Sequence, residues 1–167
     1  LLADGRRQVT GFMFPGDFLG VSIDDEYAFT AEALVPSELW WFTRDAFERF
    51  VESNPKVERE LYRLAAHELA AAQAQMVLLG RKTAAERLAS FFLSLLARNE
   101  LVQGEPATQF DLPMSRIDIA DYLGLTKETV SRMLAQLRSR RLIRLQTQNR
   151  IEVLDRDRLK AMAQGEG

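Results

Sequence analysis

The sequence predicts an α+β protein in three parts: a partial β-roll of effector type over residues 1–54, a long dimerisation helix over 55–80 and a C-terminal winged helix-turn-helix domain over 81–167. Three observations predict this class. Strand-forming and turn residues dominate the first part, the second carries an apolar heptad pattern, and the third holds a frame of about twenty residues with helix-turn-helix spacing.

Strand formers in the first part predict about four or five strands. "RRQVTGFMF" alternates in part, "PGD" at 15–17 marks a turn, and "YAFTAEALV" and "ELWWF" supply further strand formers. So few strands cannot close a barrel or a sandwich alone. Because the sequence also opens at Leu1 without a methionine, we expect that an upstream segment is missing from it.

Two helices are expected next. "TRDAFERFVESN" begins at Thr43, a candidate N-cap, and carries apolar residues at helical spacing until Pro55 breaks the pattern. From Lys56 to about Leu79 the sequence has no glycine or proline, which predicts one helix of roughly 36 Å at ~1.5 Å per residue. We expect Gly80 to break this helix.

Apolar residues of the long helix recur at steps of three and four, as in the a and d positions of a heptad repeat. This stripe consists of Tyr62, Ala65, Leu69, Ala72, Met76 and Leu79. Such a stripe usually packs against the same stripe on a second copy of the helix. No charged residue interrupts it, so it predicts a homodimer. The alternative is a helix packed against its own sheet. A second apolar strip could serve that packing, and it consists of Val57, Leu61 and Leu64.

Charge is divided unevenly along the chain. The formal net charge is −2, but residues 113–167 carry 11 Lys and Arg against 7 Asp and Glu, a charge of +4, which leaves −6 on residues 1–112. A basic C-terminal third on an acidic body is typical of a nucleic-acid-binding module joined to another domain.

Several function classes are excluded by composition. Cysteine is absent, which excludes disulfides, thiolate nucleophiles and thiolate metal sites in these residues. The sequence has one histidine, no phosphate-binding glycine loop and no metal-ligand spacing, so we expect no enzyme activity and no metal site. It has no apolar run of about 18 residues and no signal peptide, which favours a cytoplasmic location.

The third part begins with a helix in "KTAAERLASFFLSLLARNE", where Thr83 and Glu86 form a candidate capping box. Its predicted core face consists of Leu88, Phe91, Phe92, Leu95 and Leu96. "FDLP" at 110–113 is a candidate short strand. After the next helices, two β runs at 142–146 and 150–154 predict a wing that carries Arg144 and Arg150.

The helix-turn-helix frame begins at Arg116. Ala120 falls at its fifth position, where two helices nearly touch and a small residue is required. Gly124, at the ninth, permits the positive φ of the turn, and Val130, at the fifteenth, fills the space beneath the second helix. We expect Ser115 to cap the first helix.

The second helix of the frame is expected to start after the cap Thr126 and to read DNA bases. Glu128, Ser131 and Arg132 share one face near its N-terminus, the part of such a helix that reaches base edges in the major groove. The predicted phosphate contacts are Ser115, Thr126 and Lys127. The alternative is that the glutamate and the arginine are only an i, i+4 surface pair worth about 0.2 to 0.5 kcal/mol.

The chain resembles the Crp/Fnr superfamily of bacterial transcription regulators over nearly its whole length. The motifs are "RRQVTGFMFPGDFLG", like the effector barrel around its turn, "RLAAHELAAAQAQMVLLGRKTAAERLASFF", like the dimerisation helix and hinge, and "LPMSRIDIADYLGLTKETVSRMLAQL", like the helix-turn-helix. Glu-x-x-Ser-Arg at 128–132 is similar to the Fnr/FixK branch. The resemblance implies a jelly roll like that of cyclic-nucleotide-binding domains, a TTGA-N6-TCAA site, RNA polymerase as partner, and activation under low oxygen or nitrogen-oxide stress.

Departures from the family bear on the signal. The stretch "GVSIDDEYAFTAEAL" lacks the family's phosphate-binding pairs, and Asp24, Asp25 and Glu26 would repel a phosphate, which argues against cyclic AMP. Trp40 stands about where iron-sulfur members carry a ligand cysteine, which argues against that cluster. His67 lies off the heptad stripe, as a surface or packing residue does. No cofactor is evident, and the alternative is a regulator gated by a small molecule or a haem-bound gas.

Overall fold

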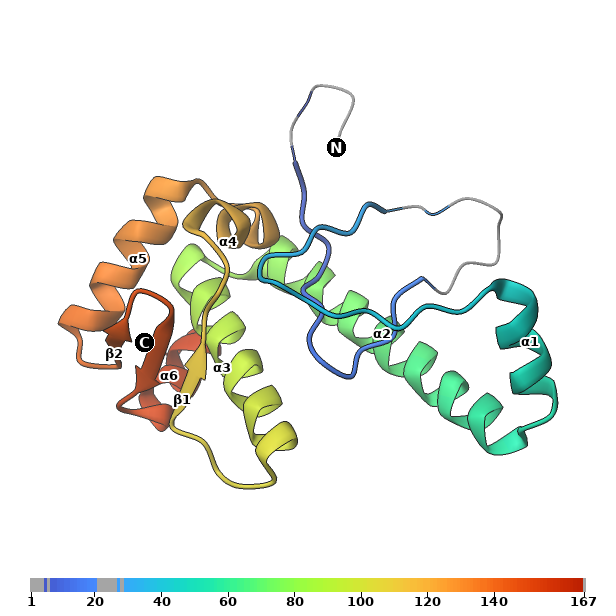
Figure 1. Cartoon of the computed structure of the whole chain (residues 1–167). Helices are drawn as coiled ribbons and strands as arrows, with labels where there is room; N and C mark the ends of the chain where they lie inside the picture. Colours follow the sequence, from blue (N-terminus) through green and yellow to red (C-terminus); the bar gives the residue numbers. More distant parts are fainter. Residues whose placement is uncertain (1–4, 6, 21–26, 28, 167) are drawn as a thin grey trace. The chain divides into compact units, whose positions relative to one another are not determined.

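A computed structural model describes residues 5, 7–20, 27 and 29–166 of the chain (Figure 1). Its elements are α1 (Arg44–Glu52), α2 (Pro55–Arg81), α3 (Ala84–Gln103), β1 (Gln109–Asp111), α4 (Arg116–Leu123), α5 (Lys127–Ser139), β2 (Ile143–Thr147), β3 (Arg150–Val153) and α6 (Arg156–Ala163). The chain forms two compact units, one of which is Pro36–Arg81 and the other the remainder. No helix of the described residues is long and apolar enough to cross a membrane.

The larger unit is built around α3, which packs against α4, α5 and α6. The predicted capping box is confirmed: Glu86 N donates to Thr83 Oγ1 at 3.4 Å, and Thr83 N donates to Glu86 Oε2 at 3.2 Å. All five predicted core positions of α3 are buried. The largest fully buried side chains of the core are Leu88, Phe92, Leu96, Leu112, Ile119, Leu123, Val130, Leu137, Leu142, Ile143, Ile151 and Leu159.

A three-stranded antiparallel sheet closes this unit, with the strand order β1-β3-β2. Phe110 of β1 pairs with Ile151 of β3, and Ile143 of β2 pairs with Val153 of β3. These four apolar side chains are buried, which ties the sheet to the core. The predicted strand at "FDLP" and the predicted two-stranded wing are therefore both present.

Helix α6 was not anticipated from the sequence. Asp155 caps it by accepting from Arg158 N at 2.9 Å, and Leu159 is fully buried beneath it. Its attachment to α3 is also ionic, because Nη1 and Nη2 of the Arg156 guanidinium donate to the Glu100 carboxylate, at 2.5 and 3.0 Å. This short helix is thus held by partners that lie far away in the sequence.

The N-terminal part differs from the sequence expectation in its local structure. Among the residues that the structure describes, no strand precedes Gln109. The turn at "PGD" is formed, since Asp17 N donates to Phe14 O at 3.0 Å and Phe14 N donates to the Asp17 carboxylate at 2.8 Å. A strand exists only where a neighbour completes its hydrogen-bond ladder, and the segments expected to be strands have no such neighbour in the described chain. The stretch with Asp24, Asp25 and Glu26 lies outside the described residues.

This N-terminal segment lies against the helix-turn-helix. The Arg7 guanidinium donates to Asp118 at 2.6 Å and to Asp121 at 3.3 Å, both on α4. Burial opposes ionisation of Asp118, but hydrogen bonds from Arg7 and Ser115 outweigh it and hold the pKa of this carboxyl below its ordinary value. The Phe12 ring adds an aromatic contact with Tyr122, with centroids 5.1 Å apart.

The second unit, Pro36–Arg81, contains α1 and α2. Thr43 caps α1 as predicted, accepting from Ala46 N at 3.3 Å. Helix α1 ends at Glu52, and Pro55 is the first residue of α2, a position where its missing N–H costs nothing. The expected break at Gly80 is wrong, because α2 continues through this glycine to Arg81.

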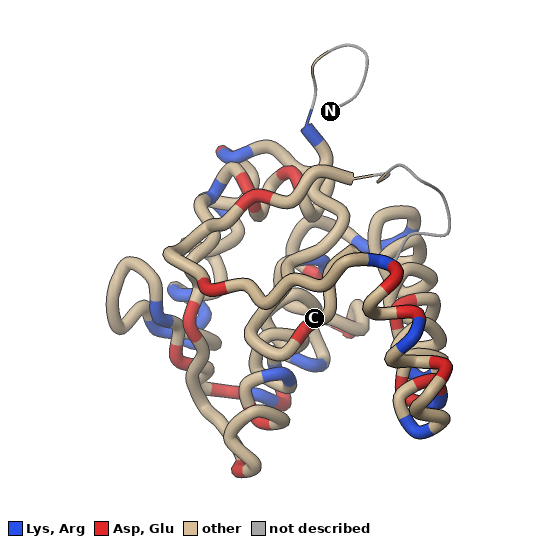
Figure 2. The backbone as a smooth tube through the Cα atoms, turned by 45° about the vertical axis from the view of Figure 1, so that its right-hand side comes forward, with Lys and Arg blue, Asp and Glu red and all other residues tan. Residues whose placement is uncertain are grey.

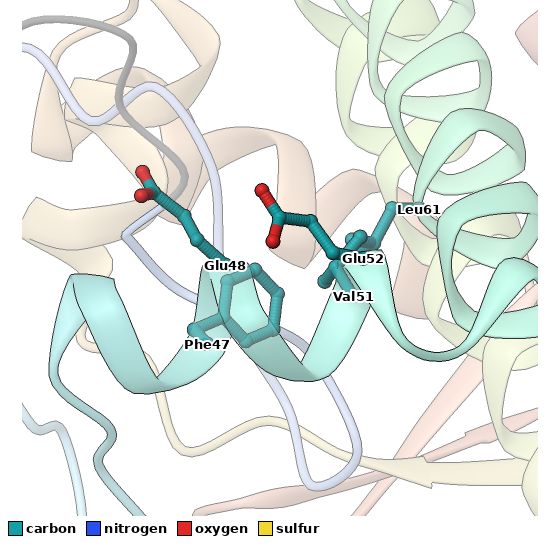
Figure 3. Close-up of a pocket in the computed structure, with 5 residues that line it drawn as sticks. All are labelled: Phe47, Glu48, Val51, Glu52 and Leu61. Carbon is teal, nitrogen blue, oxygen red and sulfur yellow. The ribbon is translucent and has the colours of Figure 1, made fainter.

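The two apolar strips of α2 have different surroundings. Leu61, on the second strip, lines a hollow together with Phe47 and Val51 of α1 (Figure 3). The heptad stripe faces outward in this unit, with Tyr62 80%, Leu69 62% and Met76 71% exposed. Within its own unit, α2 therefore uses the second strip for packing and leaves most of the heptad stripe uncovered.

Candidate DNA-binding site

The turn between α4 and α5 has the geometry that the sequence frame requires. Gly124 ends α4 with φ 61° and ψ 42°, a left-handed conformation that glycine adopts without strain. Leu125 N then donates to Ala120 O at 2.9 Å. Ala120 is 3% exposed and Val130 is 0% exposed, so both frame positions are buried between the helices. The predicted helix-turn-helix is therefore formed.

Helix α5 begins at a threonine cap and turns one apolar face to the core. Thr126 has extended backbone angles and accepts a hydrogen bond from Thr129 N at 3.2 Å. The buried face consists of Val130, Leu134 and Leu137. With a period of about 3.6 residues, burial of these positions directs Glu128, Ser131 and Arg132 outward, and all three are exposed.

The polar groups of this exposed face have few partners within the chain. Ser131 Oγ donates back to Lys127 O at 2.9 Å, and the Arg132 guanidinium donates to Thr129 Oγ1 at 3.4 Å. In the described part of the chain no ion pair joins Glu128 to Arg132, and the guanidinium contacts Thr129 instead. The carboxylate and the guanidinium are both available to a ligand.

The three residues predicted to contact phosphates lie at the starts of the two helices. Ser115 caps α4 by accepting from Asp118 N at 3.1 Å. Thr126 instead donates its hydroxyl to Thr129 Oγ1 at 3.0 Å. Lys127 is exposed at the first position of α5, where free backbone N–H groups and the helix dipole favour an anion.

Basic residues of the wing are more heavily engaged than those of α5. Arg144 donates to Glu152 at 3.1 Å, and Arg150 donates to Asp111 at 2.8 Å. The hydrogen bond with Asp111 raises the pKa of Arg150. Figure 2 marks the basic and acidic positions along the backbone. The wing arginines are therefore paired with acids, which offsets part of their charge.

One contact near the site was missed by the sequence analysis. Arg87, in the first turn of α3, donates through its guanidinium to the carbonyls of Leu123 and Gly124 in the helix-turn-helix turn. Apolar periodicity does not reveal such a contact, which spans 36 residues of sequence. A signal was present nonetheless, because a basic residue in the first turn of a helix opposes the helix dipole.

Two capped helices joined by a left-handed glycine, an outward polar face at the start of the second helix, and a β wing define a winged helix-turn-helix DNA-binding domain. Comparison with known protein families supports this class of domain. Residues 86–162 match the Crp-like helix-turn-helix domain, and residues 1–54 match the cyclic nucleotide-binding domain. The chain belongs to the Crp/Fnr family of transcription regulators, which is not a family of enzymes.

Its relatives include the nitrogen fixation regulation protein FixK of Bradyrhizobium diazoefficiens, 44% identical over 98% of this chain and 68% of the relative. The transcriptional activatory protein AadR of Rhodopseudomonas palustris is 42% identical over 98% of this chain and 67% of the relative. The structure of FixK2 from Bradyrhizobium japonicum matches with a TM-score of 0.64 and 41% identity, over 71% of this chain and 58% of that one. The chain thus spans about two thirds of its curated relatives.

Proposed function

We propose that this protein is a dimeric, sequence-specific transcription activator that binds a TTGA-N6-TCAA palindrome. The observation that carries the proposal is the exposed face of Glu128 and Arg132 at the start of α5, whose two charges do not pair with each other. The names of its relatives support the same function, since FixK is a regulation protein of nitrogen fixation and AadR a transcriptional activatory protein.

The base contacts follow from the chemistry of this face. Arg132 can donate two parallel hydrogen bonds to guanine O6 and N7. Glu128 can accept from the N4 amino group of the cytosine paired with a guanine. Ser131 can donate, accept, or contact a thymine methyl group through its Cβ. A guanine and a cytosine both occur in TTGA paired with TCAA, so one half-site offers a partner to each charged side chain.

The phosphate contacts hold α5 in the groove without reading sequence. Lys127 supplies a flexible positive charge at the start of the helix, and the hydroxyl of Ser115 can donate to an adjacent phosphate. The hydroxyl of Thr126 is engaged with Thr129, so we expect its contribution to come through the cap, which sets the position of the first free N–H groups of α5.

Dimerisation would match the two-fold symmetry of the site. Exposure of most of the heptad stripe on α2 supports pairing with a second copy, because large apolar side chains in such a row favour burial. The stripe consists of Tyr62, Ala65, Leu69, Ala72, Met76 and Leu79. Two copies of α5 would then lie about 34 Å apart, one turn of DNA. Such a dimer would act in the cytoplasm with RNA polymerase as its partner.

The match of residues 1–54 to the cyclic nucleotide-binding domain favours a second possibility, a regulator gated by a small ligand. The acidic residues Asp24, Asp25 and Glu26 argue against cyclic AMP as that ligand, because they would repel its phosphate. Trp40, in place of a cysteine, argues against an iron-sulfur cluster. We propose a response to low oxygen or nitrogen oxides, with no cofactor held by these residues.

Selection of bound sequences from a random duplex pool tests the proposed site. Purified protein should enrich two TTGA half-sites related by a dyad and separated by six base pairs. Enrichment of an unrelated motif would contradict the site, and recovery of the unselected pool would contradict sequence-specific binding. Repeating the selection without any added ligand distinguishes the two modes, since a ligand-gated regulator would enrich the site weakly.

A further inference from the structure

The guanidinium of Arg87 joins three backbone carbonyls from two places in the fold. Its Nε donates to Lys82 O at 2.9 Å, just before the cap of α3. Its Nη1 donates to Leu123 O at 2.9 Å and to Gly124 O at 3.4 Å, in the turn between α4 and α5. One side chain therefore links the segment ahead of α3 to the turn that precedes the DNA-binding helix.

The last carbonyls of α4 show why this link matters. A helix leaves its final carbonyls without intrahelical partners, and buried ones must find other donors. Ala120 O accepts from Gly124 N and Leu125 N, and Asp121 O accepts from the Gln8 side chain at 2.5 Å. Among the described residues, no backbone N–H is bonded to Leu123 O or Gly124 O. Arg87 Nη1 donates to both of these carbonyls.

Charge also favours this placement of Arg87 over a purely local role. Within its own helix it lies in the first turn, where the positive end of the dipole disfavours a cation and favours an acid such as Glu86. At the carboxyl end of α4, the same cation meets the negative end of a helix dipole. The interaction with α4 thus offsets the unfavourable position on α3.

The residue that accepts from Arg87 Nε, Lys82, is itself held in place by hydrogen bonds. Lys82, whose carbonyl accepts from Arg87, donates its ammonium group to Ser90 Oγ at 2.7 Å and to Ala163 O at 2.9 Å. It is joined to α3 and to the end of α6, so the carbonyl that holds Nε belongs to a segment with little freedom. Arg87 can therefore hold the α4–α5 turn at a fixed position relative to the segment that contains Lys82.

We infer that Arg87 is a positioning residue for DNA recognition, which holds the α4–α5 turn in place and thereby sets the orientation of α5. Gly124 lies two residues before Thr126, the cap of α5, so a shift of the turn carbonyls moves the base-contacting face. The inference rests on the proposed DNA-binding function. It gives Arg87 no contact with DNA, since Nε and Nη1 already donate to carbonyls of the protein.

The test uses the full chain with Arg87→Met, which removes all three of these hydrogen bonds, and Arg87→Lys, which keeps the charge but not the planar fork. Arg158→Met is the matched control, because it removes an exposed arginine of the same unit. In the methionine variant we expect discrimination between TTGA and a singly changed half-site to fall about tenfold. Arg87→Lys should retain part of this discrimination, and the control variant should discriminate as well as wild type.

Two further measurements separate positioning from other roles. Amide hydrogen exchange without DNA should become faster at Leu125 and Val130 in Arg87→Met and remain unchanged in the control. The slope of binding against salt should stay at the wild-type value, whereas loss of a phosphate contact would lower it by about 0.9.

Unchanged exchange at the turn, or a reduced salt slope, would overturn the inference. Wild-type protein that fails to discriminate TTGA would contradict the proposed function alone, because the exchange experiment still tests the turn. If Arg87→Met does not fold, the lysine variant still decides between these outcomes through the same exchange and salt measurements.

Discussion

The Arg132 guanidinium donates to Thr129 Oγ1, at 3.4 Å, and does not pair with Glu128, one helical turn before it. Two oppositely charged residues at this spacing on an exposed helix usually attract one another. Here the weak contact with a threonine keeps the arginine close to the helix surface while both charges stay exposed. A ligand that satisfies each of them separately fits this arrangement, and a guanine–cytosine pair is such a ligand.

Arg132→Ala should weaken binding to the palindrome by about 1 to 3 kcal/mol and relax the preference for guanine at one position of each half-site. The loss arises because the bidentate contact distinguishes guanine from other bases. Fluorescence anisotropy with a set of single-base variants measures both effects. Arg138→Ala, near the C-terminal end of the same helix, removes the same charge and should leave base preference intact. Equal losses in the two variants would contradict base contact by Arg132.

Lys127→Ala should behave differently, because a phosphate contact carries no sequence information. We expect affinity to fall by a similar factor on all duplexes, and the salt slope to decrease by about 0.9. Binding isotherms at several salt concentrations, on the palindrome and on an unrelated duplex, measure this. A loss confined to the palindrome would show that the lysine contacts a base.

Leu69→Glu should separate the proposed dimer into monomers, since it would place two carboxylates at an apolar contact across the two-fold axis. Sedimentation equilibrium at micromolar concentration measures the state. His67→Glu adds the same charge at an exposed position off the stripe and should leave the dimer intact. Wild-type protein that sediments as a monomer would contradict the dimer.

Stability of the helix-turn-helix unit should decrease in acid. The hydrogen bond from Arg156, with another from the Ala107 backbone, lowers the pKa of Glu100 below its ordinary value of 4.5. A carboxyl with a depressed folded pKa contributes stability that is present above its unfolded pKa and is lost as the pH falls through the folded value. Urea unfolding from about pH 7 to about pH 3 should show this decline.

Glu100→Gln provides the control for the acid decline. This variant should be less stable at neutral pH, and its stability should fall less as the pH drops below 4.5. Asp118, whose pKa is also lowered, remains in the variant and should account for part of the remaining decline. Parallel curves for wild type and variant would show that the contact of Glu100 with Arg156 contributes nothing.

Much of the helix-turn-helix unit follows from local sequence signals. The pair Thr83 and Glu86 forms the capping box that its spacing predicts, and Gly124 adopts the left-handed turn that the frame requires. Such signals act within one turn of helix, so a single sequence contains them completely. The outward face of Glu128 and Arg132 follows as well, because burial of the opposite face fixes it.

Other features of the fold depend on a balance of opposing energetic effects or on contacts with residues distant in the sequence. A glycine within a helix costs about 1 kcal/mol relative to alanine, but ending α2 at Gly80 would forfeit the hydrogen bonds that continue to Arg81. Helix α6 is short and depends on α3 for its burial and for the partner of Arg156. The contact of Arg87 with the turn also joins residues distant in sequence. Periodicity does not carry such information.

The central claim is that the exposed charges at the start of α5 recognise a TTGA palindrome. The most direct test measures wild-type affinity for TTGA-N6-TCAA and for a random duplex of equal length at ~0.15 M salt. The account predicts a preference of at least about a thousandfold for the palindrome. Equal affinity for the two duplexes would contradict it.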